Sequence, residues 1–180
     1  KNQIANFLRV DPQWLVVKDN MFRSVGKLSL SNKFEYLSGD GSKNNPYLID
    51  TMSDFAYIFL SSKEKRYFKL MNNIDASDFD IAYTYLDNSK DEISFELDGN
   101  NKTISNLSID KTVETGANYS TGLFGWLNAA TVKNVKVDGA TVKGNHNVGV
   151  IAGYMETAGC TIENCHVTGA TVECHVANDD

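Results

Sequence analysis

Three stretches of seven residues repeat along the second half of the chain: Thr103-Ile-Ser-Asn-Leu-Ser-Ile109, Thr131-Val-Lys-Asn-Val-Lys-Val137 and Thr161-Ile-Glu-Asn-Cys-His-Val167. Each stretch places an apolar or β-branched residue, or a cysteine, at its second, fifth and seventh positions, around a central asparagine. The stretches begin 28 and 30 residues apart. Self-similarity at a nearly constant spacing of this size indicates a repeat architecture.

Two further elements repeat in the same order. Asp138-Gly-Ala-Thr-Val-Lys-Gly144 recurs as Thr168-Gly-Ala-Thr-Val-Glu-Cys174, and Gly122-Leu-Phe-Gly-Trp126 recurs with one extra residue as Gly149-Val-Ile-Ala-Gly-Tyr154. Short β-branched elements separated by Gly, Asn or Asp predict strands. Equivalent elements lie a whole unit apart, which favours parallel stacking over hairpins, and the repeats lack the long 3.6-residue period of a helix. We therefore predict an all-β protein, a parallel β-solenoid of about three coils.

Stacking the three stretches assigns their side chains. The second, fifth and seventh residues point into the core, as Val132, Val135 and Val137 do in the middle stretch. The central asparagines are predicted to form one column at a bend, with amides hydrogen-bonded from coil to coil: Asn106, Asn134 and Asn164. The residue before each asparagine is predicted to point outwards, with opposite charges on adjacent coils: Ser105, Lys133 and Glu163. These columns are predicted to be structural.

The two ends of the chain depart from the repeat. Residues 1–36 do not fit it, and are either the end of a preceding domain or an irregular cover of the β-helix, which we place at 37–180. Ser53 can cap a helix within Thr51–Ser62, and we expect that helix to cover the first coil. The last coil ends after Ala170–Val176 without its glycine-rich strand, so we expect a piece of a longer protein, truncated at its C-terminal end.

The composition excludes several classes of function. The 180 residues include 17 Lys+Arg and 23 Asp+Glu, which give a net charge of -6 and a pI near 5.0. An acidic chain without a basic run lacks the electrostatic footprint of a nucleic-acid-binding protein. No stretch reaches the ~18 apolar residues of a membrane span, so we predict no membrane insertion in this segment. Three cysteines within the last 21 residues do not form a disulfide framework.

Four stretches come in a fixed order along the chain: Gly-Asp-Gly…Asn-Pro-Tyr-Leu-Ile (39–49), Tyr-Phe-Lys-Leu-Met-Asn-Asn-Ile-Asp (67–75), Phe-Glu-Leu-Asp-Gly-Asn-Asn-Lys-Thr-Ile-Ser-Asn-Leu (95–107) and Thr-Gly-Leu-Phe-Gly (121–125). Together they resemble the GLUG-repeat β-helical proteins of bacteria, found in adhesin-like surface proteins and in the non-catalytic parts of immunoglobulin A peptidases. The resemblance covers roughly residues 37–176. It implies a right-handed parallel β-helix on a secreted or cell-surface bacterial protein, without catalytic residues in the repeats.

Catalysis on a β-helix requires carboxylates that converge on one outward face. The sequence offers one stacked acidic pair, Asp110 over Asp138, and both residues stand at turns, where Asp bonds its own backbone. His146, His166 and His175 lack a Ser or Cys placed with an acidic partner. We predict no enzyme activity, no catalytic residue and no cofactor.

Metal-capable side chains gather in the last coil: Cys160, Cys165, His166, Cys174 and His175. Their spacing is not that of a zinc site, and Cys165 aligns with inward residues, so core or free thiols are favoured. Two acidic loops resemble calcium loops without the spaced Gly and closing Glu of a strong motif: Asp40, Ser42, Asn44 and Asp75, Asp78, Asp80. We predict no metal site.

Three aromatic residues form the candidate binding surface. Trp126 and Tyr154 follow equivalent glycines and are predicted to lie one above the other, with Tyr119 in the turn before the same strand. Outward rings would give an amphipathic platform for a host or bacterial surface glycan or protein. The structural alternative is an aromatic ladder that shields a corner of the solenoid.

The sequence leaves two functions open. The first is a non-enzymatic extracellular or bacterial cell-surface module, adhesin-like or a stalk that displays other domains. The alternative is an accessory, substrate-docking β-helix of a larger secreted enzyme such as a peptidase.

Overall fold

The computed structural model describes residues 15–18, 21–24, 37–60, 64–77, 94–112, 120–156 and 159–175. The chain divides into two compact units, Lys1–Tyr36 and Leu37–Asp180. In the smaller unit, β1 (Leu15–Lys18) pairs antiparallel with β2 (Met21–Ser24).

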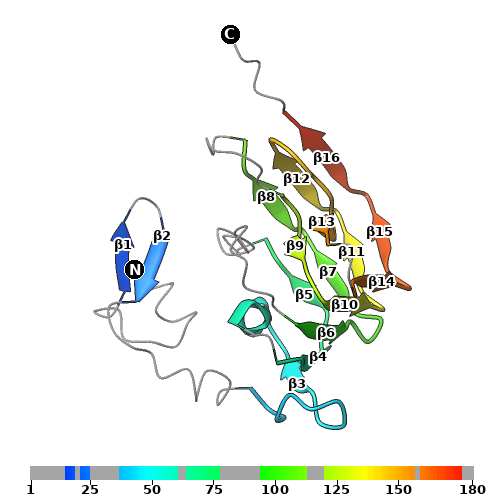
Figure 1. Ribbon diagram of the computed structural model, residues 1–180. Helices are drawn as coiled ribbons and strands as arrows, with labels where there is room; N and C mark the ends of the chain where they lie inside the picture. The colour runs from blue at the N-terminus through cyan, green and yellow to red at the C-terminus, as the bar shows by residue number, and fades with distance from the viewer. Residues whose placement is uncertain are drawn as a thin grey trace. The chain divides into compact units, whose positions relative to one another are not determined.

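The larger unit is built from four parallel sheets (Figure 1). The first sheet contains β3 (Tyr47–Ile49), β4 (Arg66–Leu70), β6 (Phe95–Asp98), β10 (Ala130–Lys133) and β14 (Thr161–Glu163). The second contains β5 (Ile74–Asp75), β7 (Thr103–Ser105), β11 (Lys136–Asp138) and β15 (His166–Thr168). The third contains β8 (Ser108–Asp110), β12 (Thr141–Gly144) and β16 (Thr171–Cys174), and the fourth contains β9 (Phe124–Leu127) and β13 (Ala152–Met155).

From β6 onwards, successive strands of the chain enter successive sheets, and each strand pairs with its equivalent one coil away. This is a parallel β-helix, as the repeat predicted. Three coils contribute to the first three sheets, and β3, β4 and β5 add partial coils before them.

The alignment of the repeat is confirmed for its second and third copies and is wrong for its first. Thr131 pairs with Thr161 but also with Glu96, whereas Thr103 pairs with Lys136. The first copy is therefore displaced by one strand. The reason is a longer corner: residues 99–102 separate β6 from β7, whereas residues 134–135 separate β10 from β11.

The predicted column of three asparagines is accordingly two columns. Asn134 and Asn164 lie at the corner between the first and second sheets, where Asn164 Nδ2 donates to Asn134 Oδ1 at 2.7 Å and Asn134 Nδ2 donates to Asp98 Oδ1 at 2.9 Å. Asn106 lies at the next corner, where its Nδ2 donates to Asp75 Oδ1 at 3.1 Å. Its equivalents there are Gly139 and Gly169. All of these corner residues have positive φ, which Asn and Gly tolerate best, so one sequence pattern fits either corner.

The helical segment follows β3 and consists of α2 (Met52–Phe55) and the 3₁₀ helix η3 (Ala56–Leu60). Thr51, not Ser53, caps it: Asp54 N donates to Thr51 Oγ1 at 3.3 Å, and Thr51 N donates to Asp54 Oδ2 at 3.0 Å. The ring of Phe55 packs 5.5 Å from that of Phe124, which lies 5.3 Å from that of Phe95. The helix therefore closes the core between the first and fourth sheets.

Candidate functional site

The aromatic pair lies on the outside of the fourth sheet. Trp126 of β9 is in register with Tyr154 of β13, and the ring centroids are 4.3 Å apart at an interplanar angle of 39°. Tyr154 is 36% exposed and Trp126 is partly exposed, whereas Phe124 and Leu127 of β9 are buried. The predicted stacking of Trp126 and Tyr154 is confirmed. Tyr119 lies outside the described residues.

Glycines position this sheet because the backbones of the two coils approach closely. A Cβ on Gly122 would lie 2.5 Å from the carbonyl oxygen of Gly149, and one on Gly153 would lie 2.5 Å from the amide nitrogen of Thr121. The glycine-rich elements that precede Trp126 and Tyr154 are therefore required for the stacking of the two rings.

The expected stack of Asp110 over Asp138 is wrong. Asp110 lies on β8 in register with Lys143, and Asp138 lies on β11 in register with Ser105 and Thr168. The error follows from the displaced first copy of the repeat. Asp110 Oδ1 accepts hydrogen bonds from Thr112 N and Oγ1, which lower the pKa of Asp110, as expected of a turn residue.

The cysteines of the last coil each contact a different backbone carbonyl. Cys160 Sγ lies 3.2 Å from Leu127 O, Cys165 Sγ lies 3.3 Å from Glu163 O, and Cys174 Sγ lies 3.0 Å from His146 O. Burial raises the pKa of the Cys165 thiol. Across the described parts of the chain, no three His, Cys, Asp or Glu side chains gather closely enough to hold a metal ion.

The acidic loop at Asp40 is organised as a turn. Asp40 Oδ1 accepts a hydrogen bond from Ser42 N at 2.8 Å, and Ser42 Oγ accepts one from Asn45 N at 3.2 Å. Hydrogen bonds from Ser42 hold the pKa of Asp40 below its ordinary value. Its carboxylate therefore stabilises the turn of its own loop. Asp78 and Asp80 lie outside the described residues.

Two columns of alternating charge run along the outside, of which the sequence predicted only the step from Lys133 to Glu163. In the first sheet, register aligns Lys69, Asp98, Lys133 and Glu163. In the third sheet, register aligns Asp110, Lys143 and Glu173. The outward column expected from Ser105, Lys133 and Glu163 is thus wrong in its first member only, because Ser105 lies in the second sheet. Correct alignment of the first coil would have found both columns.

The described residues contain no helix that is long and apolar enough to cross a membrane. The family described as the GLUG motif matches residues 144–173, which extend from the end of β12 into β16. These residues match the GLUG motif within a chain that folds as a parallel β-helix. The matched residues include the glycine-rich element and Tyr154, so the aromatic pair belongs in part to the matched repeat.

Two further proteins are similar to this chain. Halomucin of Haloquadratum walsbyi (strain DSM 16790 / HBSQ001) is 37% identical over 168 residues, which are 86% of this chain and 2% of halomucin. A crystal structure of a protein described as an immunoglobulin A1 protease, from Bacteroides ovatus, matches with a TM-score of 0.59 at 24% identity, over 79% of this chain and 46% of that chain. The second likeness shows the fold alone. Together these findings support a β-helix module with a GLUG motif.

Proposed function

We propose that this β-helix is a non-enzymatic, adhesin-like binding module of an extracellular or cell-surface protein, and that Trp126 and Tyr154 contact its ligand. The observation that supports this proposal is the outward aromatic pair on the fourth sheet. Aromatic rings are usually buried, so a partly exposed pair on a regular sheet is a candidate contact surface.

The ligand class follows from the shape of the pair. Two neighbouring rings on a sheet present apolar faces with polar edges, the indole N–H of Trp126 and the hydroxyl of Tyr154. A surface glycan has apolar ring faces and many hydroxyls, and a protein surface offers the same combination. We propose a host or bacterial surface glycan or protein as the partner.

The test is an array of glycans and surface proteins probed with the full chain and with the Trp126→Ala/Tyr154→Ala variant. Tyr67→Ala is the matched control, because Tyr67 is a partly exposed aromatic residue on β4 of the first sheet. Binding that the double variant loses and the control retains supports the proposal. Equal binding by all three chains contradicts it.

The second candidate function is a substrate-docking β-helix of a larger secreted enzyme, which the fold likeness to a protein described as an immunoglobulin A1 protease favours. The sequence of the parent protein separates the two functions. A zinc-peptidase helix with the pattern His-Glu-x-x-His supports the docking role, whereas further repeats with a wall anchor support the adhesin or stalk.

A further inference from the structure

The fourth sheet differs from the other three in charge. Its strands β9 and β13 contain no charged residue, and residues 120–129 and 147–156, which surround these strands, contain a single one, Glu156. The strands of the first sheet alone carry six charged residues: Arg66, Lys69, Glu96, Asp98, Lys133 and Glu163. The two segments of the fourth sheet therefore offer no cation that could bind an acidic group of a ligand.

A polar pair lies beside the two aromatic rings. Glu156 N donates to Leu127 O at 2.9 Å, so the ladder continues past the ends of both strands and sets Glu156 beside Asn128. Successive side chains of a strand point to opposite faces. Leu127 is fully buried, so Trp126 and Asn128 on either side of it point outwards.

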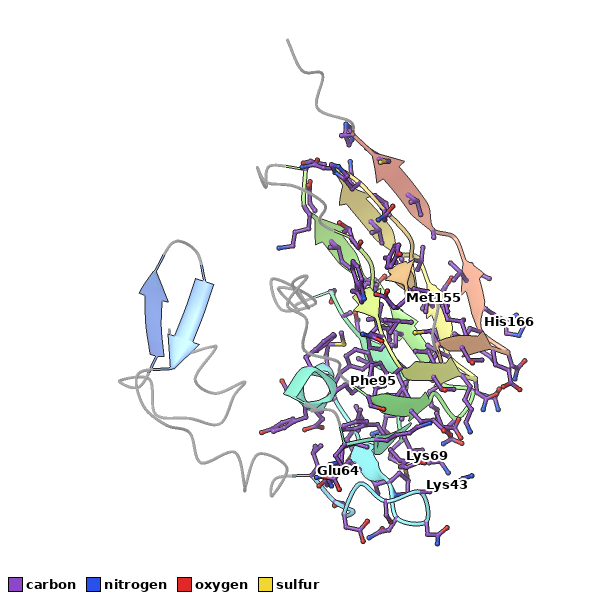
Figure 2. The ribbon with its side chains drawn as sticks, viewed as in Figure 1. Lys43, Glu64, Lys69, Phe95, Met155 and His166 are labelled. Atoms are coloured by element: carbon purple, nitrogen blue, oxygen red, sulfur yellow. The ribbon has the colours of Figure 1, made fainter. Side chains whose placement is uncertain are left out.

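The same alternation holds in β13. Met155, which Figure 2 labels, is the register partner of the buried Leu127, so its neighbours Tyr154 and Glu156 point outwards. Residues two apart on a strand are separated by about 6.6 Å. The two rings and the polar pair therefore form one surface, the ring patch: Trp126, Asn128, Tyr154 and Glu156. Its side chains project from the face of the sheet, so further pairing along the edge of β13 would not cover them.

The polar groups of the ring patch are available to a ligand. Within the ranges that the structure describes, the Asn128 amide, the Glu156 carboxylate, the indole N–H of Trp126 and the Tyr154 hydroxyl make no hydrogen bond or ion pair with the protein. In contrast, the carboxylate of Glu96 on the first sheet contacts two lysines. Groups without a protein partner bond to water, which the hydroxyls of a ligand can replace.

We propose that the ring patch binds an uncharged glycan, an inference that rests on the proposed binding function of Trp126 and Tyr154. The apolar face of a sugar ring packs on the aromatic rings. The two carboxylate oxygens of Glu156 accept hydrogen bonds from neighbouring sugar hydroxyls, and the amide of Asn128 both donates and accepts.

Charge and size select this ligand over two others. An acidic glycan would place a carboxylate or sulfate near Glu156 without a cation from either segment, and like charges at an interface disfavour a partner. A protein partner of standard size would use about 20–30 residues on this side. The ring patch is much smaller and suits one or two sugar rings.

The test is a glycan array in which each neutral oligosaccharide stands beside its sialylated or sulfated counterpart. We expect the full chain to retain neutral members and not their acidic counterparts. In calorimetry with a retained neutral glycan, Glu156→Ala should weaken binding by about tenfold or more, and Asn128→Ala by about threefold or more. Glu163→Gln, which removes an exposed carboxylate from the first sheet, is the matched control and should bind unchanged.

Glu156→Gln separates the charge from the hydrogen bonds, because it keeps a carbonyl acceptor and loses the negative charge. It should bind the neutral glycan within a few fold of the full chain and should bind the acidic counterpart better than the full chain does. Circular dichroism of each variant controls for folding.

The outcomes distinguish this inference from the proposed function. Retention of acidic glycans or of a protein alone, lost in Trp126→Ala/Tyr154→Ala, would overturn the uncharged ligand and keep the aromatic binding surface. Neutral-glycan binding that Glu156→Ala and Asn128→Ala leave unchanged would remove the polar pair from the site. Binding that survives the loss of both rings, or an array that retains nothing, would overturn the inference and the proposed function together.

Discussion

The coil formed by β10, β11 and β12 and the coil formed by β14, β15 and β16 have nearly the same sequence pattern and opposite environments. Thr141-Val-Lys in one corresponds to Thr171-Val-Glu in the other, yet Val142 is buried and Val172 is exposed. The middle coil has neighbours on both sides, and the last described coil has one. Burial in this protein is therefore a property of the neighbouring coils rather than of the residue itself.

Truncation of an apolar side chain to alanine should give the largest difference in unfolding free energy between a buried and an exposed position. Leu127 is fully buried and its register partner Met155 is exposed. Leu127→Ala should lower the free energy of unfolding by about 2–5 kcal/mol, because it removes buried contacts and leaves a cavity. Met155→Ala should cost less than about 1 kcal/mol, as exposed positions do. Urea unfolding of both variants measures the two values, and equal losses would contradict the comparison.

The loss of unfolding free energy on substitution should differ less between the corner asparagines of the two coils. Asn134 bonds to Asp98 on one side and to Asn164 on the other, and its φ is positive. Asn134→Leu should cost about 1–3 kcal/mol because it removes both bonds and strains the bend. Asn164→Leu strains a bend of similar positive φ but loses only one side-chain bond, to Asn134, and should cost less in the same urea titration.

Asn134→Gly is the control for this pair, because Gly adopts the positive φ without strain. It should retain more stability than Asn134→Leu. Equal losses of unfolding free energy in the Gly and Leu variants would show that backbone strain does not contribute to the cost of Asn134→Leu.

The stability lost on removing an ion pair should differ less between the two coils than the losses described above. Glu96 contacts Lys133 at 2.7 Å and Lys65 at 3.4 Å, and the hydrogen bond from Lys133 lowers the pKa of Glu96. A lowered carboxyl pKa contributes stability above the ordinary value of about 4.3, and that stability is lost as the pH falls through the folded-state pKa. Glu96→Gln should therefore cost about 0.5–1 kcal/mol at pH 7 and nothing at a pH below both pKa values.

Glu173→Gln, at the end of its charged column, should lower the stability less than Glu96→Gln does. The Glu173 side chain is more exposed than that of Glu96, although it too has two partners, Lys143 at 3.0 Å and His175 at 3.1 Å. Thermal unfolding of Glu96→Gln and Glu173→Gln between pH 3 and pH 7 compares the two positions. A pH-independent cost of Glu96→Gln would contradict the assigned ion pair.

The smallest effect concerns reactivity rather than stability. Cys174 is exposed, whereas Cys165 is partly buried, and burial raises the pKa of its thiol. Since the thiolate is the reactive form, a maleimide should modify Cys174 before Cys165 at neutral pH. Cys174→Ser should remove the fast reaction, and Cys165→Ser should leave it. The reverse assignment by mass spectrometry would contradict the environments described here.

The sequence predicted the β-helix because short β-branched strands recur at a nearly constant spacing. It misplaced the first coil because both corners of a coil accept Asn at positive φ, so Asn106 and Asn134 look equivalent although they occupy different corners. The length of the corner at residues 99–102 decides the register, and only the pairing of β6 with β10 reveals it.

The stacked pair Trp126–Tyr154 was predictable because local glycine-rich elements fix its alignment without reference to the first coil. The charged columns were predictable only in the step from Lys133 to Glu163, because their other members depend on which coil Asp98 and Asp110 face. Local motifs thus identified contacts within one sheet, whereas contacts that depend on the whole register needed the structure.

The contact of Trp126 with a ligand is tested most directly by tryptophan fluorescence in a Trp14→Phe chain, in which Trp126 is the only tryptophan. The titrant is each glycan or surface protein that the array retains. We predict a saturable change in the emission of Trp126 that Tyr154→Ala weakens and Tyr67→Ala leaves unchanged. Binding detected by calorimetry without any change in this emission, or an array that retains no ligand, would contradict the proposed binding surface.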